Sequence, residues 1–349
     1  MFLNTELFGH QRGASNKGYK KIKYGTMVLS TQNLHLGNAN VNQRFTHGMV
    51  SPAYKTYNIT GCSVGLIAQW IKSEAAKRFF YNATTVGASV CRRNVEWETL
   101  YEQPLYLPCI EEQEEIAKFL TLLSDRINKQ QQFVSSLKKY KRGVISVLLS
   151  SRNNPYYSSV TWKEVALCDV ASGFEYGMNA AATVYDGSHK YIRITDIDDN
   201  SHLYSQDVPV SPEGQVDEKY RVRENDILFA RTGASVGKSY CYQRSDGDLY
   251  YAGFLIRIHV NSDVNCGYVF QNTLTEAYRR WVLLESARSG QPGINAEQYK
   301  QYRFLLPPLE LQNKISTLAT NLDNLICKEE NLLSQIEQVK IALLQRLFI

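Results

Sequence analysis

Apolar residues along this chain fall into two long stretches with an alternating spacing of four and three residues, one mid-chain and one terminal. That spacing keeps one apolar stripe on one side of a helix, facing a partner helix. Each stretch covers about 40 residues, which at about 1.5 Å per residue predicts a helix about 60 Å long. The pattern predicts two rod-like helices, although it is also typical of the core face of a bundle helix.

The two stretches are copies of one pattern. Residues 107–150 align with 306–349 at a constant offset of 199 without a gap, and 12 of the 44 aligned positions are identical. A chain of two like halves is expected to do one thing twice. The stripe residues predicted to pair the helices are Ile116, Leu123, Ile127, Leu137, Ile315, Leu322, Ile326 and Ile336.

The copies also match at their ends and at their polar interruptions. The stripe turns polar at Gln130 and Glu329, and again at Lys141 and Lys340. It closes with Val144 and Leu148 in the first copy, and with Leu343 and Leu347 in the second. Each copy opens on Leu-Pro and has a glutamine six residues after the leucine, so a proline stands at or before the first helical turn.

The segments that precede the two helices resemble each other more faintly. Residues 24–31 and 225–232 each read as a turn and an apolar strand with a polar tip, followed by a glycine turn into another strand. A helical stretch follows, at about residues 65–80 and 268–286, and then a loop with Gly and Asn at 87–94 and 290–295. Mostly β segments with one or two helices predict an α+β fold.

Charge is distributed unevenly between these segments. Residues 1–107 hold 12 Lys and Arg against 5 Asp and Glu, whereas residues 153–305 hold 15 against 19. The basic first segment suits a polyanionic partner. In the acidic second segment, contact with a polyanion has to come from local basic clusters.

The cysteines and the hydropathy bound the cellular setting. Seven scattered cysteines, never in a C-x-x-C pair, favour a reducing compartment and argue against a zinc site or a disulfide framework. The sequence has neither a run of about 18 apolar residues nor a charged-then-apolar N-terminal signal. We therefore expect a soluble cytoplasmic protein with no membrane partner.

Catalytic motifs are absent from the sequence. It has no Asn/Asp-Pro-Pro-Tyr/Phe run of amino-methyltransferases, and its six histidines lack metal-ligand spacing. Gly233-Ala-Ser-Val-Gly-Lys-Ser239 mimics a phosphate-binding loop, but three residues separate its glycines where that motif needs four. The residues after it read as a strand, where the motif requires a helix. We expect no enzyme, no metal and no bound cofactor.

In combination, these features resemble the specificity subunit of Type I restriction-modification systems. The similarity rests on the duplication, on the Leu-Pro-Pro-Leu-Glu-Leu-Gln312 helix entry and on the segment Asn225-Asp-Ile-Leu-Phe-Ala-Arg-Thr-Gly-Ala-Ser-Val-Gly-Lys238. Trp162 and the residues after it also look like the usual opening of a target recognition domain. The resemblance predicts recognition domains at 1–107 and 153–305, and conserved helices at 108–152 and 306–349 that form an antiparallel coiled coil.

The resemblance also implies partners and a division of labour. Each recognition domain would read half of a bipartite double-stranded DNA target, and helix length would set the spacer between the halves. The helices would dock methyltransferase subunits, which in turn recruit restriction and translocase subunits; self-association of two copies is a further option. S-adenosylmethionine, ATP and Mg would belong to those partner subunits.

One departure concerns the first recognition domain. Asn225 comes 63 residues after Trp162, whereas 23 residues precede Tyr24 at the matching place. About 40 residues of the family pattern, including a counterpart of Trp162, are thus missing from the first domain. We expect either a shortened gene product or a first domain completed by another polypeptide.

The candidate DNA contacts lie on the hairpin tips and on the loops before the long helices. Each has an ordinary structural explanation beside it: solvation for Arg92 and Arg93, turn or cap formation for Thr31, Gln32, Asn33 and Asn295, neutralisation by aspartates for Arg193, and a plain hairpin at 231–238. The predicted contacts are Thr31, Gln32, Asn33, Asn38, Arg92, Arg93, Asn94, Arg193, Arg231, Thr232, Ser235, Lys238 and Asn295. The alternative function is a coiled-coil adaptor or decayed specificity gene product that no longer reads DNA.

Overall fold

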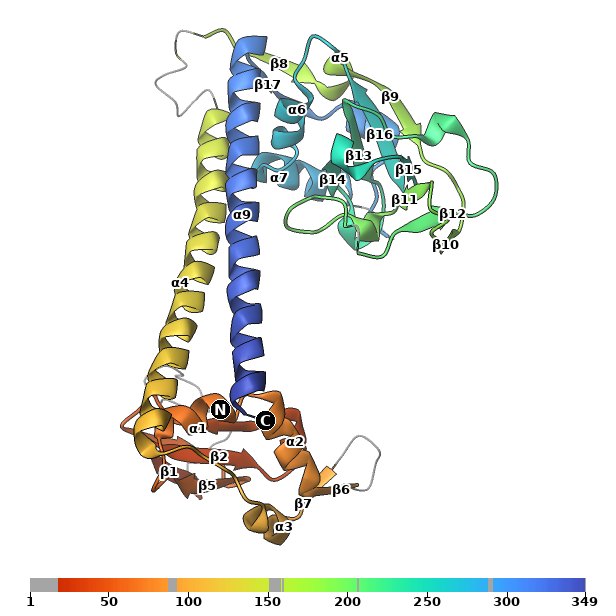
Figure 1. Ribbon diagram of the computed structural model, residues 1–349. Helices are drawn as coiled ribbons and strands as arrows, with labels where there is room; N and C mark the ends of the chain where they lie inside the picture. Colours follow the sequence, from red (N-terminus) through yellow and green to blue (C-terminus); the bar gives the residue numbers. More distant parts are fainter. Residues whose placement is uncertain are drawn as a thin grey trace. The chain divides into compact units, whose positions relative to one another are not determined.

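The computed structural model describes residues 18–86, 93–150, 158, 160–205, 207–287 and 291–348. The chain divides into two units: unit 1 is residues 1–134 with 328–349, and unit 2 is residues 135–327. Each unit combines one α+β domain with a part of each long helix (Figure 1). The helices are α4 (Ile110–Leu148) and α9 (Leu309–Leu347), so both predicted long helices are present.

Unit 1 is built around a three-stranded antiparallel sheet in the order β3-β2-β5. Met27 and Leu29 of β2 face the main core with Ile67 and Phe80, while Val28 faces a smaller cluster on the other side. The strands are β1 (Lys20–Lys23), β2 (Thr26–Ser30), β3 (Ala39–Val41), β4 (His47–Val50), β5 (Tyr54–Asn58), β6 (Thr84–Val86) and β7 (Arg93–Val95). The short helices are η1 (Leu34–Leu36), α1 (Val64–Trp70), α2 (Glu74–Asn82) and α3 (Trp97–Glu102).

Unit 2 has a four-stranded sheet in the order β14-β13-β16-β9. Its central strand β13 is buried along its whole length, with Ile227 and Phe229 in one core and Leu228 and Ala230 in another. The strands are β8 (Lys163–Ala166), β9 (Ala171–Tyr176), β10 (Ala182–Val184), β11 (Lys190–Ile192), β12 (Val210–Pro212), β13 (Asp226–Ala230), β14 (Ser239–Cys241), β15 (Leu249–Tyr251), β16 (Leu255–Val260) and β17 (Arg303–Leu306).

Unit 2 has counterparts of the short helices of unit 1 and further helical turns besides. They are α5 (Leu167–Val170), α6 (Cys266–Asn272), α7 (Glu276–Glu285) and α8 (Ala296–Lys300), with 3₁₀ turns η3 (Ile194–Asp196), η4 (Glu218–Tyr220), η5 (Gly233–Ser235) and η6 (Arg244–Asp246). In Figure 1, α6 and α7 lie between the sheet and α9. Ile315 and Ala319 of α9 and Ile145 of α4 all join the core of this unit.

The long helices pair antiparallel. Within unit 1, Lys340 Nζ donates to Ser124 Oγ at 2.7 Å and Gln130 Nε2 donates to Glu329 Oε2 at 2.6 Å, so residue numbers rise on α4 while they fall on α9. Within unit 2, Lys141 Nζ donates to Asp323 Oδ1 at 2.5 Å. The polar interruptions of the stripe thus bond between the helices, and at the offset of 199 the Lys141–Asp323 contact is the counterpart of Lys340–Ser124.

Two details of the sequence prediction are corrected. Each single helical stretch predicted after the hairpin is a pair of helices, because the Ser73 and Thr275 side chains cap a second helix by accepting from Ala76 N and Tyr278 N. The stripe also shifts at its ends: Ile145 and Leu149 are the buried residues there, and Leu347 is exposed. A straight helix drifts against a 3.5-residue repeat, which turns adjacent positions inward.

Candidate nucleic-acid interface

Both units build the same junction between a hairpin tip and the loop before the long helix. In unit 1, Gln32 bridges to Asn94, and in unit 2 Thr232 bridges to Gly293. The next backbone N–H donates across the same gap in each unit, from Asn33 to Arg93 O at 3.1 Å and from Gly233 to Pro292 O at 3.0 Å. The tip and the loop therefore present one continuous surface in each unit.

Asn33 and Arg93 hold this junction together in unit 1. Asn33 has φ 54°, and its Oδ1 accepts from the Arg93 backbone N at 3.0 Å. The Arg93 guanidinium donates to Thr84 Oγ1 at 2.8 Å and to Thr84 O at 2.6 Å, and lies 4.1 Å from the centre of the Tyr81 ring. Both side chains have internal partners, so their role as base readers remains a prediction.

The other polar residues predicted at this tip differ in whether their side chains already make hydrogen bonds within the chain. Thr31 Oγ1 donates to Ala53 O at 3.2 Å, and Asn38 Nδ2 donates to Asn33 O at 3.3 Å. The Gln32 and Asn94 side chains are exposed and make no hydrogen bond within the described part of the chain. They are therefore available to a ligand. Arg92 lies outside the described residues.

Two of the basic residues predicted in unit 2 are neutralised. Arg193 forms a two-bond ion pair with Asp196, Nε to Oδ2 at 2.8 Å and Nη2 to Oδ1 at 2.7 Å, which raises the pKa of the guanidinium. Lys238 is 11 % exposed, and its Nζ pairs with Asp199 and donates to Ile197 O at 2.9 Å. Asn295 accepts from Gln298 N at 2.8 Å as the N-cap of α8.

Arg231 is different, because it keeps an unpaired guanidinium. Its charge centre lies 4.9 Å from the centre of the Tyr176 ring and 5.9 Å from that of Phe254. It makes no ion pair within the described residues, and its buried Nε lacks a hydrogen-bond partner there. Phe254 is 59 % exposed. Thr232 and Ser235 follow Arg231 along the same tip, so a cation held by aromatic rings shares this tip with two hydroxyl-bearing residues.

Sequence reasoning missed a second aromatic and basic cluster, in unit 1. Lys55 Nζ lies 3.9 Å from the centre of the Trp97 ring, and Tyr57 OH and Tyr101 OH are 2.6 Å apart. Tyr101 is 58 % exposed. The cluster joins β5 to α3, which follows β5 by about 40 residues in the sequence. A local sequence pattern therefore cannot predict it.

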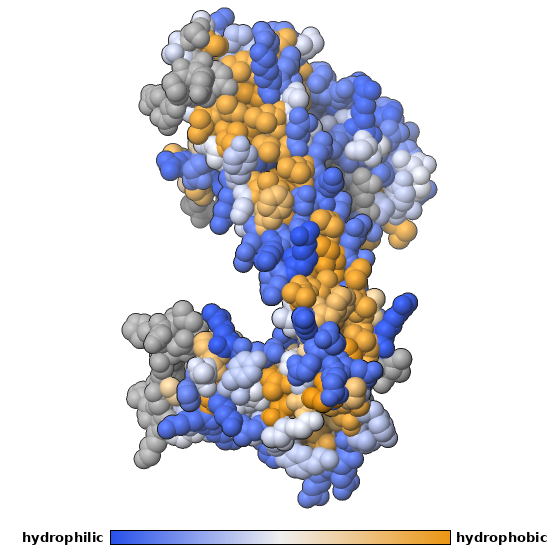
Figure 2. Space-filling view, turned by 60° about the vertical axis from the view of Figure 1, so that its left-hand side comes forward, coloured by the Kyte–Doolittle hydropathy of each residue, from blue (hydrophilic) through white to orange (hydrophobic). Residues whose placement is uncertain are grey.

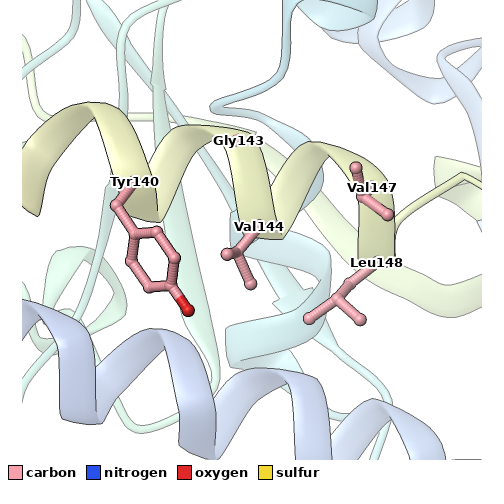
Figure 3. A pocket seen from close by; sticks show the side chains of 5 residues that line it. All are labelled: Tyr140, Gly143, Val144, Val147 and Leu148. Carbon is pink, nitrogen blue, oxygen red and sulfur yellow. The ribbon is translucent and has the colours of Figure 1, made fainter.

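A shallow apolar hollow lies on α4 within unit 2. It encloses about 390 Å³ and is lined by Tyr140, Gly143, Val144, Val147 and Leu148. In Figure 3 the side chains of Tyr140, Val144 and Leu148 project from one side of the helix. Apart from the Tyr140 hydroxyl, the lining has no group for acid, base or nucleophilic chemistry. The hollow is therefore better suited to contact with an apolar protein surface than to binding a substrate for catalysis.

The hollow belongs to an exposed apolar line on the long helices. Large apolar side chains recur at intervals of seven or fourteen residues and are 38 to 61 % exposed, and Figure 2 shows apolar patches over these helices. In unit 1 they are Phe119, Phe133 and Val339, and in unit 2 they are Tyr140, Val147, Leu318 and Leu325. None of these residues belongs to the predicted pairing stripe, but the hollow itself also includes Val144 and Leu148 of that stripe.

Comparison with known proteins identifies the family. Residues 159–338 match the model of the Type I restriction modification DNA specificity domain, which is more than half of the chain. The chain belongs to this specificity family. It is 22% identical over 261 residues to the Type I restriction enzyme StySPI specificity subunit of Salmonella potsdam, and the match covers 69% of this chain and 56% of that protein.

The fold of this specificity-family chain is shared with solved structures. A Type-I restriction-modification S subunit from M. genitalium matches with a TM-score of 0.61 and 14% identity, over 97% of this chain and 86% of that one. A chain from a study of type I R-M complex assembly and conformational transition matches with a TM-score of 0.59 and 14% identity, over 96% and 84%. The α+β fold with two recognition domains and long helices is thereby confirmed.

Two observations bound the chemistry of this family member. Among the described residues, no three His, Cys, Asp or Glu side chains gather so as to hold a metal ion. Gly233–Ser235 is a short 3₁₀ turn that leads into strand β14, as the sequence predicted, so this segment lacks the helix N-terminus of a phosphate-binding loop. Within the same residues, no helix has the length and apolar character needed to cross a bilayer.

Proposed function

We propose that this chain is the non-catalytic DNA-specificity subunit of a Type I restriction-modification complex, reading a bipartite target with its two recognition domains. The observation that carries the proposal is the tip–loop junction built twice, by the Gln32–Asn94 bridge and by the Thr232–Gly293 bridge. Two equivalent surfaces in a chain of this family suit two half-sites. A half-site is read through base edges, while phosphate contacts set the position of the protein.

The two surfaces offer different side chains to DNA. Gln32 and Asn94 are exposed amides, the type that contacts adenine in the major groove, and Arg231 carries the guanidinium that suits guanine or a phosphate. Different readers predict two dissimilar half-sites. Unit 1 adds the basic character of its segment, which favours the polyanion without sequence preference.

The exposed line on the long helices is the proposed docking surface for methyltransferase subunits. Its side chains are apolar and unused within the described chain, and water-exposed apolar lines of this kind are typical of protein interfaces. S-adenosylmethionine, ATP and Mg would then be bound by the methyltransferase and restriction subunits. This chain would supply the target address and the scaffold.

The proposal is tested by sequencing modified bases in DNA from cells that hold the cognate methyltransferase, with and without this chain. A chain-dependent motif with two dissimilar halves supports the proposal. A palindromic motif would mean that two copies act through the second domain alone. Methylation that does not depend on the chain, with a soluble methyltransferase present, would reject the proposal in favour of an adaptor or a decayed gene product.

Variants assign the half-sites. Arg231→Ala is expected to weaken discrimination in the second half-site by about 1–3 kcal/mol, because one good contact between a side chain and a base contributes about that much. Gln32→Ala should affect the first half-site alone. Arg244→Ala is the matched control, since this exposed arginine already pairs with Glu224. Equal loss in both halves would contradict the assignment.

The docking surface is tested by co-purification with the methyltransferase. Tyr140→Asp combined with Val147→Asp places two charges on the apolar line at positions outside the predicted pairing stripe, and we expect the partner to be lost. Ser146→Asp, at an exposed position of the same helix, is the control. Retention of the methyltransferase by the double variant would place the docking surface elsewhere.

A further inference from the structure

A buried glutamine ties each recognition domain to its long helix. Gln113, near the start of α4, is 4 % exposed. Its Oε1 accepts from the Ser63 backbone N at 2.8 Å, and its Nε2 donates to Pro108 O at 2.8 Å. Ser63 is the N-cap of α1 and accepts from Leu66 N through its side chain. One side-chain amide thus joins the first helix of the domain to the turn that starts α4.

Unit 2 repeats this arrangement with its own residues. Gln312 is 3 % exposed, its Oε1 accepts from the Asn265 backbone N at 2.9 Å, and its Nε2 donates to Pro307 O at 2.8 Å. Asn265 is the N-cap of α6. The N-cap residue and much of the surrounding sequence differ between the two halves, yet both bonds of the glutamine are kept.

The helices also meet closely beside each glutamine. A Cβ added to Gly65 of α1 would lie 2.9 Å from Ala117 Cβ on α4, closer than carbon atoms pack. A Cβ added to Gly267 of α6 would overlap Ser316 Oγ on α9. Each contact brings backbone against a small side chain, so α1 and α6 have little room to slide along or away from the long helix.

Most of the remaining contacts between domain and helix are apolar, although in unit 2 Asn265 Nδ2 also donates to Asn313 Oδ1 of α9 at 2.8 Å. Leu107 packs against the unit 1 core, and Ile315 and Ala319 join that of unit 2. Apolar burial is strong but non-directional, and it tolerates small rotations. Two hydrogen bonds to backbone groups define position and angle together.

We propose that Gln113 and Gln312 are positioning residues that set the register of each recognition domain on its long helix, and thereby the register in which that domain reads its half-site. The inference rests on the proposed function. Each glutamine governs its own half-site: Gln113 the one read by unit 1, and Gln312 the one read by unit 2.

The test compares Gln113→Met, Gln312→Met and the control Gln131→Met by modified-base sequencing with the cognate methyltransferase. Gln131 is an exposed glutamine on the same helix, and its Nε2 donates to Glu337. In Gln113→Met, the preference for the methylated target base over other bases in the first half-site should fall at least about tenfold, or the position of that half-site should vary. The second half-site should stay unchanged. Gln312→Met should do the reverse. An unchanged motif, or equal loss in both halves, overturns the proposal.

Gly65→Ala and Gly267→Ala act on the same junctions without removing a hydrogen-bonding group. We expect each to broaden the same half-site as the neighbouring glutamine variant. Because alanine favours helix formation over glycine, a fall in helix content cannot cause this result. An unaffected motif in both alanine variants, at full methylation, contradicts the control of register by this junction.

Hydrogen exchange separates failure of this inference from failure of the proposed function. In Gln113→Met, amides at the start of α1 should exchange about tenfold faster or more, which equals about 1.4 kcal/mol, while those of α6 keep their rate. If the unsubstituted chain directs no methylation, the proposed function fails. Hydrogen exchange then still tests whether Gln113 holds α1 against α4. Unchanged exchange in α1 overturns it.

Discussion

Units 1 and 2 share a hydrogen-bonded skeleton and differ in what surrounds it. The strands that lead to the tip, β2 and β13, each lie between two antiparallel neighbours. In unit 2 a further strand, β9, pairs with the far edge of β16, whereas among the described residues of unit 1 nothing pairs with the matching edge of β5. The skeleton survives this difference because the tip, the loop and the long helix depend on the central strands.

The surfaces of the two units diverge further than their skeletons. In unit 2 aspartates hold Arg193 and Lys238, whereas in the described part of the unit 1 recognition domain the ion pair is Lys77 with Glu74, on α2. Asn38 stands where unit 2 has Lys238. Backbone contacts therefore fix the scaffold of both units, whereas the charged and polar side chains on it differ between them.

Alkaline pH should produce the largest difference between the units. Every fully buried tyrosine within the described residues lies in unit 2, and burial raises the pKa of Tyr240, Tyr278, Tyr299 and Tyr302. An unfolded tyrosine titrates near about pH 10. Above that pH the folded state keeps more protons than the unfolded state, so stability falls as pH rises.

We therefore expect unit 2 to unfold between about pH 10 and 12, before unit 1, as followed by circular dichroism and tyrosinate absorbance. Tyr299→Phe should move this transition to higher pH. A common midpoint for both units would contradict the difference in their cores.

Truncation at matched core positions comes next. Phe229→Ala should destabilise unit 2 by about 3–5 kcal/mol, and Leu29→Ala should destabilise unit 1 by about 2–5 kcal/mol. Phe229 is fully buried, and its ring centre lies 4.8 Å from that of Tyr299, so its loss leaves the larger cavity. Calorimetry should show each variant lowering one transition. A shift of both transitions by either variant would mean that the units unfold together.

Substitutions at matched tip residues should differ by a smaller amount in their cost to stability. Lys238→Met removes the partner of Asp199 and of two loop carbonyls, at an expected cost of about 1–3 kcal/mol. Asn38→Met, at the exposed counterpart, should stay within about 0.5 kcal/mol. Urea unfolding of both variants measures the contrast, and equal losses would show that Lys238 does not hold the 194–199 segment.

The smallest effect is expected from exposed ion pairs. Arg244→Ala breaks the ion pair with Glu224. The Arg244 side chain is 81% exposed and that of Glu224 is 62% exposed, so the change in stability should be at most about 1 kcal/mol. The same holds for Lys77→Ala in unit 1. Raising the salt concentration should erase either change, and a salt-independent loss would point to packing by the arginine stem.

Much of the architecture follows from sequence pattern alone. The offset of 199 predicts both long helices and the matching positions at which their stripes turn polar, and the turn–strand–glycine pattern predicts β2 and β13. These features are local or repeated, so periodicity and alignment reveal them. The division of each helical stretch at Ser73 and Thr275 was missed, because a capping hydroxyl within an apolar pattern looks like any other polar position.

The candidate site was less accessible to prediction. Lys238 and Arg93 looked like free basic residues, yet their partners Asp199 and Thr84 lie 39 and 9 residues earlier. Whether a charge is available depends on such contacts, which spacing does not encode. The environment of Arg231 depends on Tyr176, at the end of β9, and on Phe254, in the turn before β16.

The Gln130–Glu329 hydrogen bond joins two residues that occupy the same place in the two repeats. An ancestral single-repeat chain pairing with its own copy would have set identical residues opposite each other there. Two glutamines can bond to each other, whereas two glutamates would repel. The divergence of this position after duplication therefore favours pairing of the first helix with the second over pairing of the second helix with another copy of itself.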